Sequence, residues 1–153
     1  MNRRQFVCTA MASVVVASAR PVGASQTRMT VYKDPSCGCC GAWATAMGNA
    51  GFQVDLREVD DLDSIKRKYR VPQTAEGCHT AVLGPYFIEG HVPLDAVKRL
   101  RNEVPDILGI AVPAMPLGSL GMGDDPSVAS YDVLSVSRSG ETAVYMSVRP
   151  KKV

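Results

Sequence analysis

The sequence predicts a small α/β sandwich that follows an export signal. Strand and helix patterns alternate with short connections from Thr27 onward, and 153 residues are enough for one domain with a moderate core. The composition, 46% hydrophobic and 21% charged, is typical of a globular protein and excludes a disordered, collagen-like or polytopic membrane chain. A net charge of +2 is too small to favour a nucleic-acid-binding protein.

Residues 1–24 have the pattern of a cleavable export signal. Arginines near the start precede an uncharged stretch of about 14 residues, which is shorter than the roughly 20 that cross a bilayer as a helix. Residues 3–7 (Arg-Arg-Gln-Phe-Val) resemble the twin-arginine signal of bacteria, and a general secretory signal is the alternative. We therefore expect a periplasmic protein that is not inserted in the membrane after cleavage. Cys8 would be removed, leaving four cysteines.

The first part of the fold is predicted as two strand–helix units. Residues 29–33 form a strand, and a helix beginning at about Cys39 has apolar residues at helical spacing: Trp43, Ala46, Met47 and Ala50. Residues 52–57 alternate apolar and polar, which predicts a strand with Phe52, Val54 and Leu56 on its buried face. Asp61 can cap a second helix whose apolar stripe is Leu62, Ile65 and Tyr69.

A hairpin and a third helix follow. Residues 80–83 and 86–88, joined at Gly84-Pro85, have the pattern of two paired strands. Pro93 can open a helix that turns Leu94, Val97, Leu100 and Val104 inward. The resulting order, β-α-β-α-β-β-α, is that of the thioredoxin-like sandwich, and we expect this core to span residues 25–104.

The rest of the chain, residues 105–153, is expected to be an extension that packs on the core. Residues 106–126 contain four glycines, three prolines and two methionines, which predicts an irregular loop. Residues 131–136 and 142–148 flank Arg138-Ser139-Gly140 and are predicted as a second hairpin.

Three cysteines crowd the predicted start of the first helix. Cys37 and Cys40 form a C-x-x-C pair where a helix N-terminus stabilises thiolates, which suits a redox pair. Cys39 adds a third thiol that offers a competing exchange route, so the trio suits metal capture better. The fourth thiol, Cys78, precedes His79 at the entry to the third strand, which in this type of fold lies against the helix tip. We expect these residues to converge on one site.

The donor types favour a soft metal ion. Four thiolates around one Zn²⁺ would form a closed structural site with net charge −2, whereas the same thiolates shared among several Cu(I) ions approach neutrality. Further soft or imidazole donors are available in His91, before the third helix, and in Met115 and Met122, in the glycine-rich loop. Each of these could instead be an ordinary packing residue.

Four motifs in order resemble those of the CopG-type periplasmic copper-resistance proteins, which are also catalogued as a domain of unknown function. They are residues 37–40 (Cys-Gly-Cys-Cys), 78–82 (Cys-His-Thr-Ala-Val), 89–93 (Glu-Gly-His-Val-Pro) and 114–122 (Ala-Met-Pro-Leu-Gly-Ser-Leu-Gly-Met). The resemblance spans about residues 27–136 and implies a thioredoxin-like fold with a C-terminal extension, Cu(I) bound by the cysteines, and a role in copper tolerance. Ala114 stands where the family pattern has glycine, which concerns loop conformation only.

The leading interpretation is a periplasmic copper-binding protein that holds more than one Cu(I) in a multi-thiolate site. Its metal ligands are predicted to be Cys37, Cys39, Cys40, Cys78, His79, His91, Met115 and Met122, and Cys37 and Cys40 could also cycle as a disulfide. Copper ions and other periplasmic copper-handling proteins are the expected partners. A thiol–disulfide oxidoreductase acting on proteins, with Cys37 as nucleophile and Cys40 resolving, is the alternative, and a zinc-stapled interaction module is a third.

Overall fold

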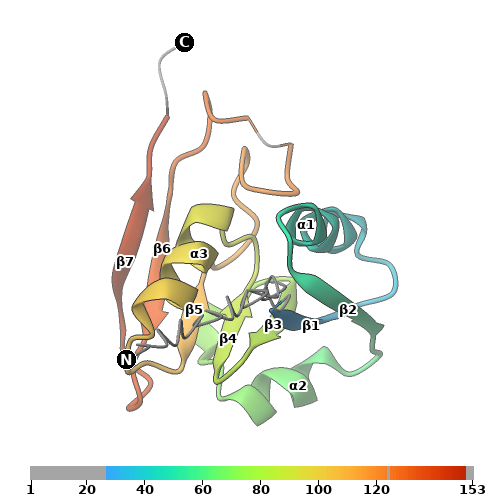
Figure 1. Cartoon of the computed structure of the whole chain (residues 1–153), viewed down its shortest axis with the longest axis vertical. Coiled ribbons are helices and arrows are strands. Elements are labelled where there is room, and N and C mark those ends of the chain that lie inside the picture. Colours follow the sequence, from blue (N-terminus) through green and yellow to red (C-terminus); the bar gives the residue numbers. More distant parts are fainter. Residues whose placement is uncertain (1–26, 124, 151–153) are drawn as a thin grey trace, which may run out of the picture.

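A computed structural model describes residues 27–123 and 125–150, and the predicted export signal lies outside these residues. The α/β class and the predicted order of elements are confirmed (Figure 1). The elements are β1 (Arg28–Lys33), α1 (Gly38–Asn49), β2 (Gln53–Glu58), α2 (Leu62–Tyr69), the 3-10 turn η1 (Gln73–Ala75), β3 (His79–Leu83), β4 (Tyr86–Glu89), α3 (Leu94–Glu103), β5 (Gly109–Ala111), β6 (Tyr131–Val136) and β7 (Thr142–Val148).

The strands of the described residues join one seven-stranded sheet in the order β2-β1-β3-β4-β5-β6-β7. The β1–β2 and β4–β5 pairs are parallel and the other pairs are antiparallel. The C-terminal hairpin of β6 and β7 therefore continues the sheet of the preceding strands, with β5 as the link.

Strand β5 corrects one prediction, because it lies inside the segment expected to be an irregular loop. It is only three residues long and two of them are small, so it carries no alternating pattern that a sequence reading could detect. Gly109 allows it to approach β4 closely, since a Cβ at that position would lie 2.2 Å from the carbonyl oxygen of Phe87. Pairing of Ile110 with Ile88 then places a buried side chain in the sheet.

Helices cover both faces of the sheet. The larger apolar cluster joins α1 and α3 to one face and is centred on Trp43, Met47, Val97 and Leu100. A smaller cluster on the other face includes Phe87 and residues that follow α2, among them Val71 and Ala75. Each face of the β3–β4 hairpin is therefore shielded from solvent, so a polar side chain on either face needs a partner or a ligand.

Two residues expected to be inward are exposed. Leu56 is 44% exposed because β2 is an edge strand with one neighbour. Val104 is 65% exposed because α3 ends at Glu103 and Val104 forms its left-handed cap, with φ 46°. The cap by Asp61 is confirmed, since its side chain accepts a hydrogen bond from Ser64 N. None of the helices in the described part of the chain has the length and apolar character required to cross a bilayer.

Candidate metal centre

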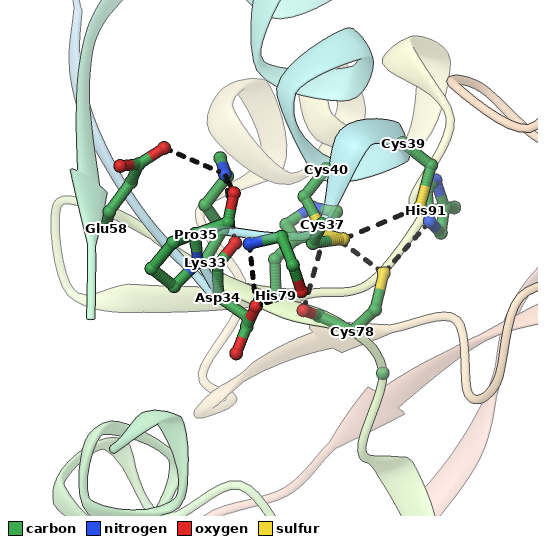
Figure 2. The surroundings of a disulfide bond; sticks show 12 residues. Lys33, Asp34, Pro35, Cys37, Cys39, Cys40, Glu58, Cys78, His79 and His91 are labelled. Carbon is green, nitrogen blue, oxygen red and sulfur yellow. Dashed lines mark hydrogen bonds and ion pairs between the residues drawn. A yellow bond between two sulfur atoms is a disulfide. The ribbon is translucent and has the colours of Figure 1, made fainter. Parts of the chain in front are cut away.

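The first turn of α1 presents three cysteines. Cys37 is the N-cap residue, and its N–H donates to Asp34 O at 3.0 Å, which closes the turn before the helix. Cys37 and Cys40 form a disulfide with a Cα–Cα distance of 5.5 Å, while Cys39 remains a free thiol. Figure 2 shows these residues at the start of the helix, with Cys78 facing them.

A buried lysine stabilises the turn that carries Cys37. Lys33 is 5% exposed, and its Nζ donates to Asp34 O at 2.9 Å and to Pro35 O at 3.2 Å. The same ammonium group lies 3.1 Å from a carboxylate oxygen of Glu58 on the neighbouring strand β2 (Figure 2). The turn is therefore tied to the sheet by polar contacts, and the position of Cys37 follows from it.

Cys78 completes a group of four sulfur atoms. It lies directly before β3, whose first residue, His79, pairs with Lys33 at the end of β1. This register brings the entry to β3 next to the start of α1, and the sulfurs of Cys37, Cys39, Cys40 and Cys78 all lie within 4.8 Å of one another. The predicted convergence of the four thiols is thus what the structure has, although the Cys37–Cys40 bond leaves only Cys39 and Cys78 as thiols.

Two histidines meet the sulfur group at Cys78. The Cys78 Sγ atom lies 3.0 Å from His91 Nε2 and 3.5 Å from His79 Nδ1. His91 Nδ1 lies 2.8 Å from the carbonyl oxygen of Leu120, which can only accept, so Nδ1 carries the proton and Nε2 has its lone pair toward Cys78. Burial lowers the pKa of His91, which favours the neutral ring that a metal requires.

His79 is the most enclosed member of the group. It is fully buried, and its ring centroid lies 4.6 Å from that of Trp43. Burial, followed by the nearby His91 and Lys66, lowers the pKa of His79 to about 3, so the ring is neutral. Its Nε2 atom has no hydrogen-bond partner among the described residues. A buried nitrogen without a partner destabilises a fold by about 1–3 kcal/mol, which a bound metal ion or other ligand would offset.

The Cys78 thiol is held in its protonated form. Burial and, second, the neighbouring Cys39 raise the pKa of Cys78 to about 12. With a neutral His91 beside it, the thiol donates a hydrogen bond to the Nε2 lone pair. A cation that binds here must therefore displace that proton, and both the sulfur and the nitrogen become free to act as ligands.

The loop that contains Met115 and Met122 packs against the start of α1. A Cβ at Gly121, where φ is +83°, would lie 2.9 Å from Cys39 O, so the loop approaches the start of α1 closely. Met122 is partly buried in this turn, where its N–H donates to Ser119 O at 2.7 Å. Met115 is 52% exposed. The roles of Met115 and Met122 as ligands stay predictions.

The donor set fits a soft metal ion. Four cysteine sulfurs and two imidazole rings come together from the α1 turn, the β3 entry and the segment after β4. Sulfur and imidazole donors favour Cu(I) over hard cations such as Mg²⁺ or Ca²⁺.

Sequence patterns did not reveal two further residues beside this centre. Lys66 and Glu89 are buried and ion-paired on the opposite face of the β3–β4 hairpin. The apolar stripe predicted for its helix, Leu62, Ile65 and Tyr69, does not include Lys66. Glu89 ends an otherwise apolar strand, β4, and this position was the available signal that its carboxylate is buried.

Comparison with known proteins gives one matching family model and two similar solved structures. A family model described as "Protein of unknown function, DUF411" matches residues 75–122, which contain Cys78 and both histidines. The solved structure named "Copper resistance protein copG- Form 1" shares 36% identity, covers 82% of this chain and 99% of its own, and superposes with a TM-score of 0.76. The chain belongs to the CopG family. The "Form 2" structure of that name gives 36% identity, 80% and 98% coverage and a TM-score of 0.75. No curated protein matches the sequence significantly.

Proposed function

We propose that this CopG family member binds Cu(I) in a multi-thiolate site completed by histidine, and that it protects the periplasm from copper. The observation that carries the proposal is the convergence of six sulfur and imidazole donors at the start of α1 and the entry to β3: Cys37, Cys39, Cys40, Cys78, His79 and His91. The names of the solved relatives support copper resistance as the setting. Residues 1–24 would direct export, and Met115 and Met122 would cover the site.

Cys39 distinguishes a copper site from a simple dithiol. It is not part of the disulfide, and its Sγ lies 3.6 Å from that of Cys37. We expect Cys39→Ser to lower the number of Cu(I) ions bound by anaerobically purified protein, while Cys37 and Cys40 still oxidise. Thr45→Ser, on the exposed side of the same helix, is the matched control. Metal analysis beside a thiol count makes the measurement, and unchanged copper binding by Cys39→Ser would contradict the proposal.

We also propose that copper loading is coupled to the Cys37–Cys40 pair. These two thiolates can give two electrons to an oxidant and form one disulfide, after which they no longer bind Cu(I) as thiolates. Cys39, Cys78 and His91 would remain as a smaller site. Titrating copper-loaded protein with a mild oxidant, while following thiols and bound metal together, should show copper released or oxidised as the disulfide forms. Disulfide formation with no change in copper would leave a passive copper holder.

The disulfide at a helix N-terminus also favours a second candidate, exchange of disulfides with protein substrates. That activity has no need of Cys39, Cys78 or the histidines. Protein that gains no copper during growth in copper medium, yet reduces a protein disulfide at a rate unaffected by Cys39→Ser, would favour this second function.

A further inference from the structure

A second buried polar cluster lies behind the metal centre. We call it the Lys66–Glu89 clamp, and it consists of Lys66 from α2, Gly77 before β3, Thr80 in β3 and Glu89 at the end of β4. Glu89 is fully buried and Lys66 is 4% exposed. Lys66 Nζ pairs with Glu89 Oε1 and also donates to Gly77 O at 3.0 Å.

Lys66 and Glu89 form hydrogen bonds with both backbone polar groups of Gly77. Its carbonyl accepts from Lys66, and its N–H donates to Glu89 Oε1 at 2.8 Å. The other carboxylate oxygen, Oε2, accepts from Thr80 Oγ1 at 2.6 Å, which fixes the orientation of the carboxylate. Gly77 therefore cannot shift without breaking hydrogen bonds to buried charges.

Two residues of the clamp, Gly77 and Glu89, lie next to segments of the metal centre. Gly77 precedes Cys78, and Glu89 is two residues before His91. The two segments also touch directly: Gly90 N–H donates to His79 O at 2.9 Å, and a Cβ at Gly77 would lie 2.7 Å from Gly90 Cα. Because side chains alternate along a strand, His79 faces α1 while Thr80 faces the clamp.

We propose that Lys66 and Glu89 are positioning residues of the metal centre: through Gly77 they fix Cys78 Sγ relative to His91 Nε2. The inference rests on the proposed function. A buried ion pair contributes little net stability compared with apolar side chains of similar size, so stability alone does not require these charges. Hydrogen bonds behind a ligand commonly change metal affinity by about 10- to 100-fold, because they set the ligand's orientation.

Two double variants separate positioning from charge. Lys66→Met/Glu89→Gln removes both charges but keeps a side-chain carbonyl that can accept from Gly77 N–H. Lys66→Met/Glu89→Met removes the acceptor as well and keeps an apolar side chain of similar length. Three quantities are measured on the full mature chain: Cu(I) affinity by competition with a chelator, the rate of Cys78 alkylation by iodoacetamide in reduced metal-free protein, and the thermal midpoint. Cys39 alkylation serves as the internal reference.

We expect the Glu89→Gln double variant to keep Cu(I) affinity close to that of the wild type. The Glu89→Met double variant should bind Cu(I) about tenfold or more weakly and expose Cys78 to faster alkylation. Both are measured well below its thermal midpoint, which should fall because Gly77 N–H and the Thr80 hydroxyl lose their acceptor. Equal Cu(I) affinity in the two double variants would overturn the inference. If the wild type binds no Cu(I), the proposed function fails, and the alkylation rates alone decide whether the clamp positions Cys78.

Thr80→Val provides the same test if the Glu89→Met double variant does not fold. It is isosteric and removes only the hydroxyl that orients Glu89 Oε2. We expect it to weaken Cu(I) binding and speed Cys78 alkylation in the same direction, by a smaller factor. Wild-type values for both in this variant would overturn the inference.

Discussion

The Cys/His centre and the Lys66–Glu89 clamp lie back to back on the β3–β4 hairpin, yet their polar atoms are satisfied in different ways. In the clamp, the ammonium group and both carboxylate oxygens have partners within the protein. In the Cys/His centre, His79 Nε2 has no hydrogen-bond partner in the described chain, and Cys39 and Cys78 remain free thiols. A complete cluster is a finished part of the fold, whereas the unpartnered nitrogen in the same interior supports the proposal that the Cys/His centre binds a metal ion.

The largest effect on stability is expected when only one of the two charges in the Lys66–Glu89 clamp is removed. Lys66→Met alone leaves the Glu89 carboxylate buried without its cation, which should lower the free energy of unfolding by about 3–5 kcal/mol. Burial raises the pKa of Glu89, so the deficit should shrink at low pH, where Glu89 takes up a proton. Urea denaturation at two pH values measures both effects. If the free energy of unfolding falls by less than about 1 kcal/mol at neutral pH, the charges of Lys66 and Glu89 interact only weakly.

Removing a ligand should affect copper more than it affects the fold. His91→Ala is expected to weaken Cu(I) binding by about 100-fold, or about 2.7 kcal/mol, because its Nε2 faces Cys78. The metal-free protein should lose about 1–2 kcal/mol of stability through the hydrogen bond to Leu120 O. Chelator competition and denaturation of the metal-free protein give the two numbers, and equal losses would indicate a structural histidine.

Acid should destabilise the metal-free protein through His79. The pKa of His79 is about 3 in the folded protein, against 6.5 for an ordinary histidine in the unfolded chain. The stability that depends on its neutral form is therefore fully present above pH 6.5 and is lost as the pH falls toward 3. Between pH 7.5 and 4.5 the loss from this residue should be about 2–3 kcal/mol. His79→Leu should show a smaller difference between urea denaturations at these two pH values. The same pH dependence in both proteins would place the acid sensitivity elsewhere.

The smallest effect is expected in the loop that adjoins both clusters. Ala114 has a φ of 59°, and its N–H donates to Glu76 O at 3.3 Å, beside the bridge to Gly77. Left-handed alanine is strained by about 1–2 kcal/mol, and glycine relieves this at some cost in chain entropy. Ala114→Gly should therefore raise the unfolding free energy by about 0.5–1 kcal/mol, measured by thermal denaturation. A decrease would mean that the alanine methyl group makes a compensating contact.

Local patterns along the chain determined the α/β class, the order of elements and the bounds of β6 and β7. The apolar spacing around Trp43, the cap at Asp61 and the alternation of residues 131–136 and 142–148 are short-range signals, and the structure follows them. The candidate site was visible for a similar reason, because Cys37, Cys39 and Cys40 lie within four residues of sequence and Cys78 and His79 form a distinct pair.

Only the tertiary structure decided which donors are satisfied and what lies behind them. Strand β5 exists because a neighbour supplies its hydrogen bonds, and Leu56 is exposed because β2 lies at the edge of the sheet that the described residues form. The proton position on His91 depends on Leu120 O, far along the chain. The burial of Lys66 and its pairing with Glu89 depend on how α2 packs against β3 and β4. Such contacts join residues distant in sequence, so local propensity and periodicity carry no information about them.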